Sequence, residues 1–281
     1  MAQSLDYRSP PLEDRTVEFD ATQNEPYHLR FLPVPKRVRA LLAGEPIADS
    51  TRVMLMLETK RLPVYYFPRE DVRMDLLGPS RHSTDSAHKG PATYWNVRTN
   101  GRAAENAAWA YLDSPEDLSA LRDYVAFYWE KMDAWFEEDD EVFVHPRHPY
   151  HRVDVLQSSR HVRVLVGSQT IAETRRPRLL IETDLPVRYY IPKIDVRLDL
   201  LVPSDTTTAC PYKGKASYWH VKVGRRLFRD YVWGYPTPIP ECPKIENHLC
   251  FFNERVDAIY VDNEEQPVPK TPWSVEKRRR R

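Results

Sequence analysis

The apolar positions of this chain fall into short runs separated by polar turns. The runs are rich in Val, Ile, Leu, Tyr and Trp, and the prolines lie between them rather than inside them. Short apolar runs bounded by proline are typical of β-strands. We predict strands over residues 38–42, 53–57, 64–67, 72–77, 93–97, 124–129 and 134–137, and over their counterparts in the second half of the chain.

The segment from Asp71 to Leu76 has the clearest alternation of charged and apolar residues. A period of two places Val72, Met74 and Leu76 on one face and the charged residues on the other. Such a pattern is typical of an antiparallel strand that is buried on one side only. We therefore predict a half-buried strand here and in the matching segment.

The second half of the chain repeats the pattern of the first. Residues 38–97 align with residues 162–221 at a constant offset of 124, and 27 of the 60 pairs are identical. A period this long is much greater than that of a solenoid, so it indicates a duplicated domain. Each copy then serves as an internal control on conclusions about the other.

One short helix fits in each copy. Residues 114–117 offer a Ser N-cap followed by proline in the first turn and then two acids. In the second copy, Pro240 and Pro243 would break a long helix, so we expect a short one that begins near Leu118 or Lys244. The predicted fold is mainly β, with two tandem small antiparallel β domains that are barrel-like or tent-like, each with at most one short helix.

The repeat and the composition at each end of the chain suggest four segments. We expect a polar N-terminal extension over 1–33, a first repeat domain over 34–146, a second over 147–272, and a basic tail over 273–281. A unit of this size can bury enough apolar surface for its own core. We expect the two repeats to pack against each other within the chain.

The charges of the chain balance, because Lys plus Arg and Asp plus Glu each number 41. This balance argues against a nucleic-acid partner. No apolar run approaches the roughly 18 residues that a membrane helix needs, and the first residues lack the pattern of a secretion signal. We expect a cytoplasmic protein with no membrane partner, and the basic run at 277–281 leaves a nuclear location open.

The cysteines lie in the second copy alone, at Cys210, Cys242 and Cys250. A disulfide framework or a zinc site would normally show an even set or paired Cys-x-x-Cys ligands. Neither pattern occurs, so no metal site is predicted. No sequence feature indicates a cofactor.

Four further elements occur in a fixed order in the second copy: Tyr189-Tyr190-Ile191-Pro192, the Asp195 to Asp199 segment, the Cys210 to Trp219 segment, and Trp233-Gly234-Tyr235. With them the chain resembles the family catalogued as domain of unknown function 427, which carries a nucleotidyltransferase-like label. The resemblance covers two tandem copies from about residue 34 to 274. It implies no settled activity. The residues do not support the label, because the chain lacks a Gly-x-x-x-x-Gly-Lys-Ser/Thr loop to cradle phosphates.

The polar residues of these elements are the candidates for chemistry. They are Asp195, Arg197, Lys213, Tyr218 and Cys210 in the second copy, and Asp71, Arg73, Lys89 and Tyr94 in the first. Each lysine precedes a glycine at a turn, where it can bind an anion, transfer a proton or form an imine. The alternative is an ion pair with a strand acid such as Asp199. Cys210 is replaced by Ser86 in the first copy, so a thiol nucleophile would limit activity to the second.

Two functions from different classes remain open at this point. The first is an enzyme that acts on a small organic molecule, for example in metabolite biosynthesis, with the polar set above as its machinery. The second is a non-catalytic ligand-binding or assembly module in which the repeats form a pseudo-dimer within one chain. The second copy matches the family elements more fully, which suggests the first as its partner, but if the chemistry falls to Asp, Arg, Lys and Tyr, both copies keep the residues for it.

Overall fold

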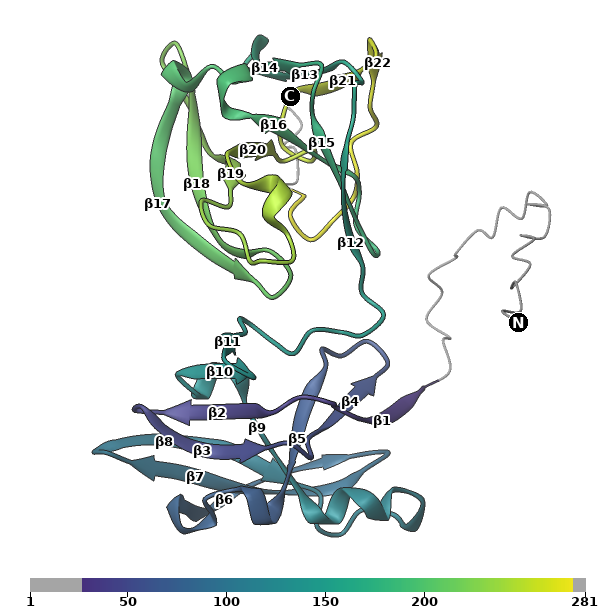
Figure 1. Cartoon of the computed structure of the whole chain (residues 1–281), viewed down its shortest axis with the longest axis vertical. Helices are drawn as coiled ribbons and strands as arrows, with labels where there is room; N and C mark the ends of the chain where they lie inside the picture. The colour runs from purple at the N-terminus through teal and green to yellow at the C-terminus, as the bar shows by residue number, and fades with distance from the viewer. Residues whose placement is uncertain (1–26, 275–281) are drawn as a thin grey trace, which may run out of the picture.

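The computed structural model describes residues 27–274, which form two similar β units (Figure 1). Each unit combines one seven-stranded antiparallel sheet with one four-stranded antiparallel sheet. The prediction of two tandem, mainly β domains is therefore confirmed. The strand order in each sheet is linear, so neither sheet closes on itself.

The first unit has a seven-stranded sheet in the order β1-β4-β5-β9-β8-β7-β6 and a four-stranded sheet in the order β11-β10-β2-β3. Its strands are β1 (Leu29–Pro33), β2 (Val38–Leu42), β3 (Glu45–Ser50), β4 (Met54–Glu58), β5 (Val64–Pro68), β6 (Leu77–Ser86), β7 (Gly90–Thr99), β8 (Arg102–Ala110), β9 (Tyr124–Phe127), β10 (Ala134–Glu137) and β11 (Asp140–Glu141). Its 3₁₀ helices are η1 (Arg69–Asp71), η2 (Met74–Leu76), η3 (Glu116–Asp123) and η4 (Trp129–Lys131).

The second unit has the corresponding orders β12-β15-β16-β20-β19-β18-β17 and β14-β13-β21-β22. Its strands are β12 (Val153–Gln157), β13 (Val162–Val166), β14 (Gln169–Thr174), β15 (Arg178–Glu182), β16 (Arg188–Pro192), β17 (Leu201–Cys210), β18 (Gly214–Val223), β19 (Arg226–Gly234), β20 (His248–Phe251), β21 (Ala258–Val261) and β22 (Glu264–Glu265). Its 3₁₀ helices are η5 (Lys193–Asp195), η6 (Leu198–Leu200) and η7 (Pro243–Ile245).

Alternation along the strands places apolar side chains on both faces of each seven-stranded sheet. In β5, Tyr65 and Phe67 belong to the cluster that packs against the four-stranded sheet, whereas Tyr66 belongs to a second cluster on the opposite face. The same division separates Trp95 from Tyr94 in β7. The large sheet is therefore covered on both faces, and aromatic residues of both clusters line the candidate site.

The predicted strand over 72–77 is wrong in its backbone. Val72 forms only an isolated bridge to Ala48, and Met74–Leu76 form the 3₁₀ helix η2. The predicted division into faces nevertheless holds, because Val72 is buried and Met74 and Leu76 pack against the same core. Alternation in the sequence indicates which side chains point toward the core. A backbone that bends can place those side chains there as well as a straight strand does. Val196 and η6 repeat this arrangement.

The predicted short helix of each unit is found as η3 and η7, both of the 3₁₀ type, with further 3₁₀ turns elsewhere, and Ser114 donates to the Leu118 carbonyl instead of capping η3. No α-helix forms within residues 27–274, and η3 is the longest helical segment described there. In the second unit η7 spans three residues and begins at Pro243, as expected from the prolines on its N-terminal side. The described residues include no helix that is long and apolar enough to cross a membrane.

The first unit begins earlier in the chain than the sequence predicted. Strand β1 pairs with β4, so the first sheet begins within the segment 1–33 that the sequence assigned to a polar extension. Residues 143–152 join the units (Figure 1) and contact the second one: Arg147 pairs with Glu241, and the backbone N–H of His148 donates to the Tyr212 hydroxyl at 2.7 Å. Most of the expected extension and the basic run 277–281 lie outside the described residues.

Candidate functional site

The first unit contains a cavity of about 1020 Å³ at one end of its seven-stranded sheet. Residues from β4, β5, β7, β8 and β9 line it, together with the β6–β7 turn, η4 and residues 144–146. Its aromatic lining residues are Tyr27, Tyr65, Tyr66, Tyr94, Trp109, Tyr111, Phe127, Tyr128, Trp129 and Trp135. Aromatic walls with a few polar groups are typical of small-molecule sites.

A buried ion pair forms one side of this cavity. Lys89 Nζ lies 2.5 Å from Glu58 Oε2, and the lysine is 4% exposed. Glu58 Oε1 accepts a hydrogen bond from the Tyr27 hydroxyl at 3.1 Å and lies 3.1 Å from Arg61 Nε. The left-handed backbone at Gly90, with φ of +80°, turns the chain so that the preceding lysine reaches β4. The carboxylate is fully partnered, which is what a buried charge requires.

Tyrosine hydroxyls continue the polar lining. The Tyr94 hydroxyl lies 2.9 Å from Thr84 Oγ1 and 3.4 Å from the Tyr128 hydroxyl. Burial, aided by the charge of Glu58, raises the pKa of Tyr27 and of Tyr111 to about 12. Burial and the bond to Tyr94 likewise raise the pKa of Tyr128 above its ordinary value. These phenols therefore stay protonated near neutral pH and can donate hydrogen bonds to a ligand.

The second unit keeps the lysine pair, buried as in the first. Lys213 Nζ lies 2.6 Å from both carboxylate oxygens of Glu182, and the lysine is 7% exposed. His151 Nε2 lies 3.1 Å from Glu182 Oε1, where the first unit uses Tyr27. The sequence offered Asp199 as a partner for Lys213, but Asp199 pairs with Arg197 at 2.6 Å. Lys213 is thus occupied by a residue 31 positions earlier in the chain.

A difference between the units that bears on the cavity lies at the start of β5 and β16. Val64, which lines the cavity, corresponds to Arg188. The Arg188 guanidinium donates to both carboxylate oxygens of Glu254, at 2.6 and 2.8 Å, and both side chains are almost fully buried. Glu254 occupies the position of Glu130, another cavity-lining residue. Two lining positions of the first unit therefore hold mutually bonded side chains in the second.

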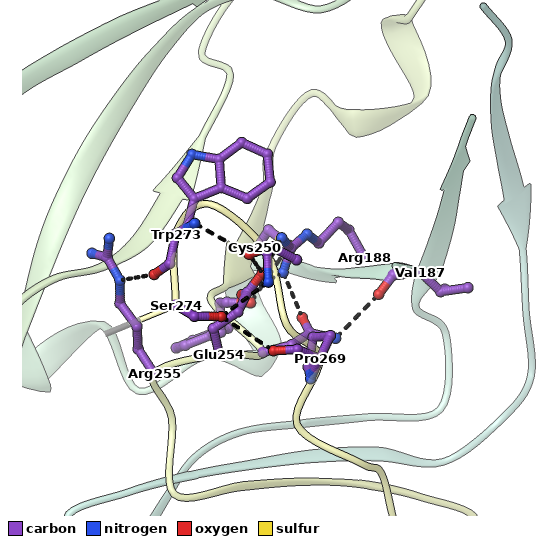
Figure 2. A network of polar contacts seen from close by, with 11 residues as sticks. Val187, Arg188, Cys250, Glu254, Arg255, Pro269, Trp273 and Ser274 are labelled. Atoms are coloured by element: carbon purple, nitrogen blue, oxygen red, sulfur yellow. Dashed lines mark hydrogen bonds and ion pairs between the residues drawn. The ribbon is translucent and has the colours of Figure 1, made fainter. Parts of the chain in front are cut away.

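The C-terminal segment covers this pair (Figure 2). Thr271 Oγ1 donates to Glu254 Oε1 at 2.6 Å, and the Arg188 guanidinium lies 5.5 Å from the centroid of the Trp273 ring. Burial alone would raise the pKa of Glu254, but the hydrogen bonds from Arg188 and Thr271 hold it below its usual range. Both groups are therefore charged near neutral pH, and the pair fills its site as an ionic unit.

The Asp and Arg candidates lie apart from the lysine cluster. None of them lines the cavity. Asp71 accepts a hydrogen bond from Ser50 Oγ at 2.6 Å, and Arg73 forms a bidentate pair with Asp75. In the second unit Arg176, at 3.1 Å, is the main cause that holds the pKa of Asp195 below its usual range.

Of the nine residues proposed from the sequence, the structure brings Lys89 and Tyr94 together at the cavity of the first unit. Their counterparts, Lys213 and Tyr218, pack within the second unit, where the Tyr218 hydroxyl lies 2.9 Å from Thr208 Oγ1. Cys210 is half-buried at the end of β17. Within residues 27–274 no group of three or more His, Cys, Asp or Glu side chains is placed to hold a metal ion.

The sequence reasoning did not select the lysine partners Glu58 and Glu182 as site residues. Their signal was present, because this glutamate is identical in both copies at the offset of 124. It also did not select Arg188. The sequence signal was a charged residue at the start of the otherwise apolar run Arg188-Tyr-Tyr-Ile. A charge at that position requires a buried partner, and only the folded chain identifies it as Glu254.

Comparison with known families identifies the family of the chain. It belongs to the family described as Domain of unknown function (DUF427), whose model matches twice, over residues 30–138 and 154–262. The two matches are the two β units, so the resemblance stated from the motifs is confirmed. No curated protein matches the chain.

Proposed function

We propose that the first repeat binds a small organic molecule in its aromatic cavity and that the second repeat acts as its structural partner within the chain. The observation that carries this proposal is the contrast between the copies. A cavity of about 1020 Å³ lies in the first, whereas positions 188 and 254 of the second bond to each other. The family elements are more complete in the second repeat, whereas this contrast favours the first as the binding repeat.

The lining supports a ligand with both flat apolar and polar parts. Trp109 and Tyr128 lie with ring centroids 4.5 Å apart, and Trp129 stacks on Trp135 at 4.4 Å. Rigid rings gain contact area at low entropic cost. The Glu58–Lys89 pair and the Tyr94 hydroxyl supply hydrogen-bonding groups that fix the orientation of a ligand.

We also propose that the first repeat catalyses a reaction of the bound molecule. Lys89 and Glu58 are a proton donor and a proton acceptor held in contact at the cavity wall, which is the arrangement that general acid–base chemistry needs. Tyr94 lies at the same wall as a further hydroxyl donor. In the second repeat the counterparts of two cavity-lining residues, Arg188 and Glu254, bond to each other, so this repeat is proposed as a non-catalytic assembly module.

Binding can be tested by giving the first repeat the residue that the second one has. In Val64→Arg the new guanidinium can reach Glu130 and occupy the part of the cavity beside it, whereas Val64→Leu is a control that adds one methylene. Each purified protein is incubated with a mixture of small metabolites, washed, and analysed by native mass spectrometry. We expect wild type and Val64→Leu to retain a ligand and Val64→Arg to lose it. Wild type without any ligand, or equal retention by Val64→Arg, contradicts the proposal.

Catalysis is tested separately on the retained molecule. Its mass is followed with time in wild type, Lys89→Met and the matched control Lys213→Met, each checked for folding by circular dichroism. We expect wild type and folded Lys213→Met to convert the molecule and Lys89→Met to bind it unchanged. Conversion by Lys89→Met at the wild-type rate contradicts a catalytic role for Lys89, and an unchanged ligand in all three proteins shows a binding module.

A further inference from the structure

The second repeat contains a cation at the place that corresponds to the cavity of the first. The guanidinium of Arg188 lies 5.6 Å from the centroid of the Trp233 ring and is bonded to Glu254 through two hydrogen bonds. Trp233 and Glu254 correspond to Trp109 and Glu130, and both of the latter line the cavity. The cation of the second repeat is thus bound by the counterparts of two cavity residues.

The aromatic part of this site has the same geometry in both repeats. Trp233 and Phe252 lie with ring centroids 4.4 Å apart and their planes at 44°. Trp109 and Tyr128 lie 4.5 Å apart with planes at 40°. The wall on which the Arg188 guanidinium lies is therefore preserved in the first repeat, although the arginine itself is absent.

The acid of this site is available in the first repeat. Glu130 is exposed and has no ion pair or side-chain hydrogen bond among residues 27–274, whereas Glu254 is saturated by Arg188 and Thr271. Val64 is too short to reach it. The first repeat thus retains the aromatic wall and the carboxylate but has no cation at the position of Arg188.

A neighbouring positive charge does not prevent cation binding at such a site. Lys131 Nζ lies 5.4 Å from the centroid of the Tyr128 ring and donates to the backbone oxygen of Glu105. The second repeat has Arg255 at the same position, 4.2 Å from the Phe252 centroid, and still holds Arg188. The arrangement of one bound cation beside one rim cation is therefore present in this fold.

We infer that the cavity of the first repeat takes a small organic cation, with a guanidinium or amine group seated between Trp109 and Glu130. A guanidinium suits both contacts, because its plane stacks on an aromatic ring while its edge donates two hydrogen bonds to a carboxylate. This inference rests on the proposed function and names the chemical class of its ligand. It places the cationic end of the ligand at Glu130 and leaves the Glu58–Lys89 pair for the remainder of the molecule.

The test compares two probes of the same shape and different charge. Ethylguanidinium chloride and its neutral analogue ethylurea are titrated into the full chain and followed by ligand-observed NMR. We expect ethylguanidinium to bind at least about threefold more tightly than ethylurea, because only the cation gains from the Glu130 carboxylate and the Trp109 ring. Glu130→Gln, at an exposed position that tolerates substitution, should remove this preference, whereas Glu116→Gln at another exposed site should not.

A second arm uses the repeat that already holds a cation. Arg188→Val leaves Glu254 buried without its partner, and ethylguanidinium should raise the melting temperature of this variant more than ethylurea does. Equal binding of the two probes to wild type, or an undiminished preference in Glu130→Gln, overturns the inference. If neutral or anionic metabolites bind to wild type and not to Val64→Arg, the proposed function stands and only the inferred cationic class of ligand is wrong. If no metabolite binds, the proposed function itself fails.

Discussion

The buried pair between Arg188 and Glu254 gives the sharpest prediction for stability. In Glu254→Gln the guanidinium keeps an amide oxygen as acceptor but loses the charge that compensates its own. Glu254 is 0% exposed and the Arg188 side chain 7% exposed, so water cannot replace the lost carboxylate. Removal of one partner from a buried ion pair costs about 3–5 kcal/mol.

The position of Glu130 supplies the matched control for this change. It is the counterpart of Glu254 in the first repeat and is exposed, so Glu130→Gln should change the free energy of unfolding by less than about 0.5 kcal/mol. Replacing both members of the buried pair with apolar residues, as in Arg188→Met with Glu254→Leu, should recover most of the loss, because no uncompensated charge is left.

Urea unfolding followed by circular dichroism measures these changes in the free energy of unfolding, and thermal unfolding measures the change in melting temperature. Domains of this size shift by at least about 2 °C per kcal/mol, so the melting temperature of the second repeat should fall by at least about 6 °C in Glu254→Gln. A loss of less than about 1 kcal/mol in this variant, or an equal loss in Glu130→Gln, would refute the conclusion that the buried charge of Arg188 depends on Glu254.

Three further predictions follow from other contacts. The pKa of Glu254 is lower in the folded chain than in the unfolded chain, where it is about 4.5. The ionised carboxylate therefore contributes its full stabilisation above about pH 4.5 and loses it as the pH falls through the folded pKa. The difference in free energy of unfolding between wild type and Glu254→Gln should shrink from about pH 6 to about pH 3 in urea titrations. Gly214→Ala should cost about 1–3 kcal/mol by the same method, because φ is +100° and a Cβ would lie 3.3 Å from a backbone oxygen; an unchanged midpoint would contradict this. Burial raises the pKa of Cys242 to about 11 and of Cys250 to about 12, so a thiol reagent near pH 8 should label Cys210 first in the native chain, and three equal rates would contradict the assigned burial.

The sequence alone determined the architecture at the level of repeats and most strands. The offset of 124 identified two copies, and the apolar runs located β2, β5, β10 and β21 to within one residue. It did not locate β6, because Leu77–Ser86 is a polar edge strand with little burial and hence no alternation to detect. It also assigned a strand to 72–77, since side-chain alternation constrains the inward direction more than the backbone path.

The tertiary structure alone decided where the candidate site lies. Lysines 89 and 213 were found from the sequence, but their partners Glu58 and Glu182 lie 31 residues earlier and meet them only through the fold. The family motifs are more complete in the second repeat, which suggested the first as its partner. A single difference, valine at 64 and arginine at 188, reverses that preference. Arg188 and its buried partner occupy the positions of two cavity-lining residues, and only the three-dimensional structure places that partner opposite Arg188.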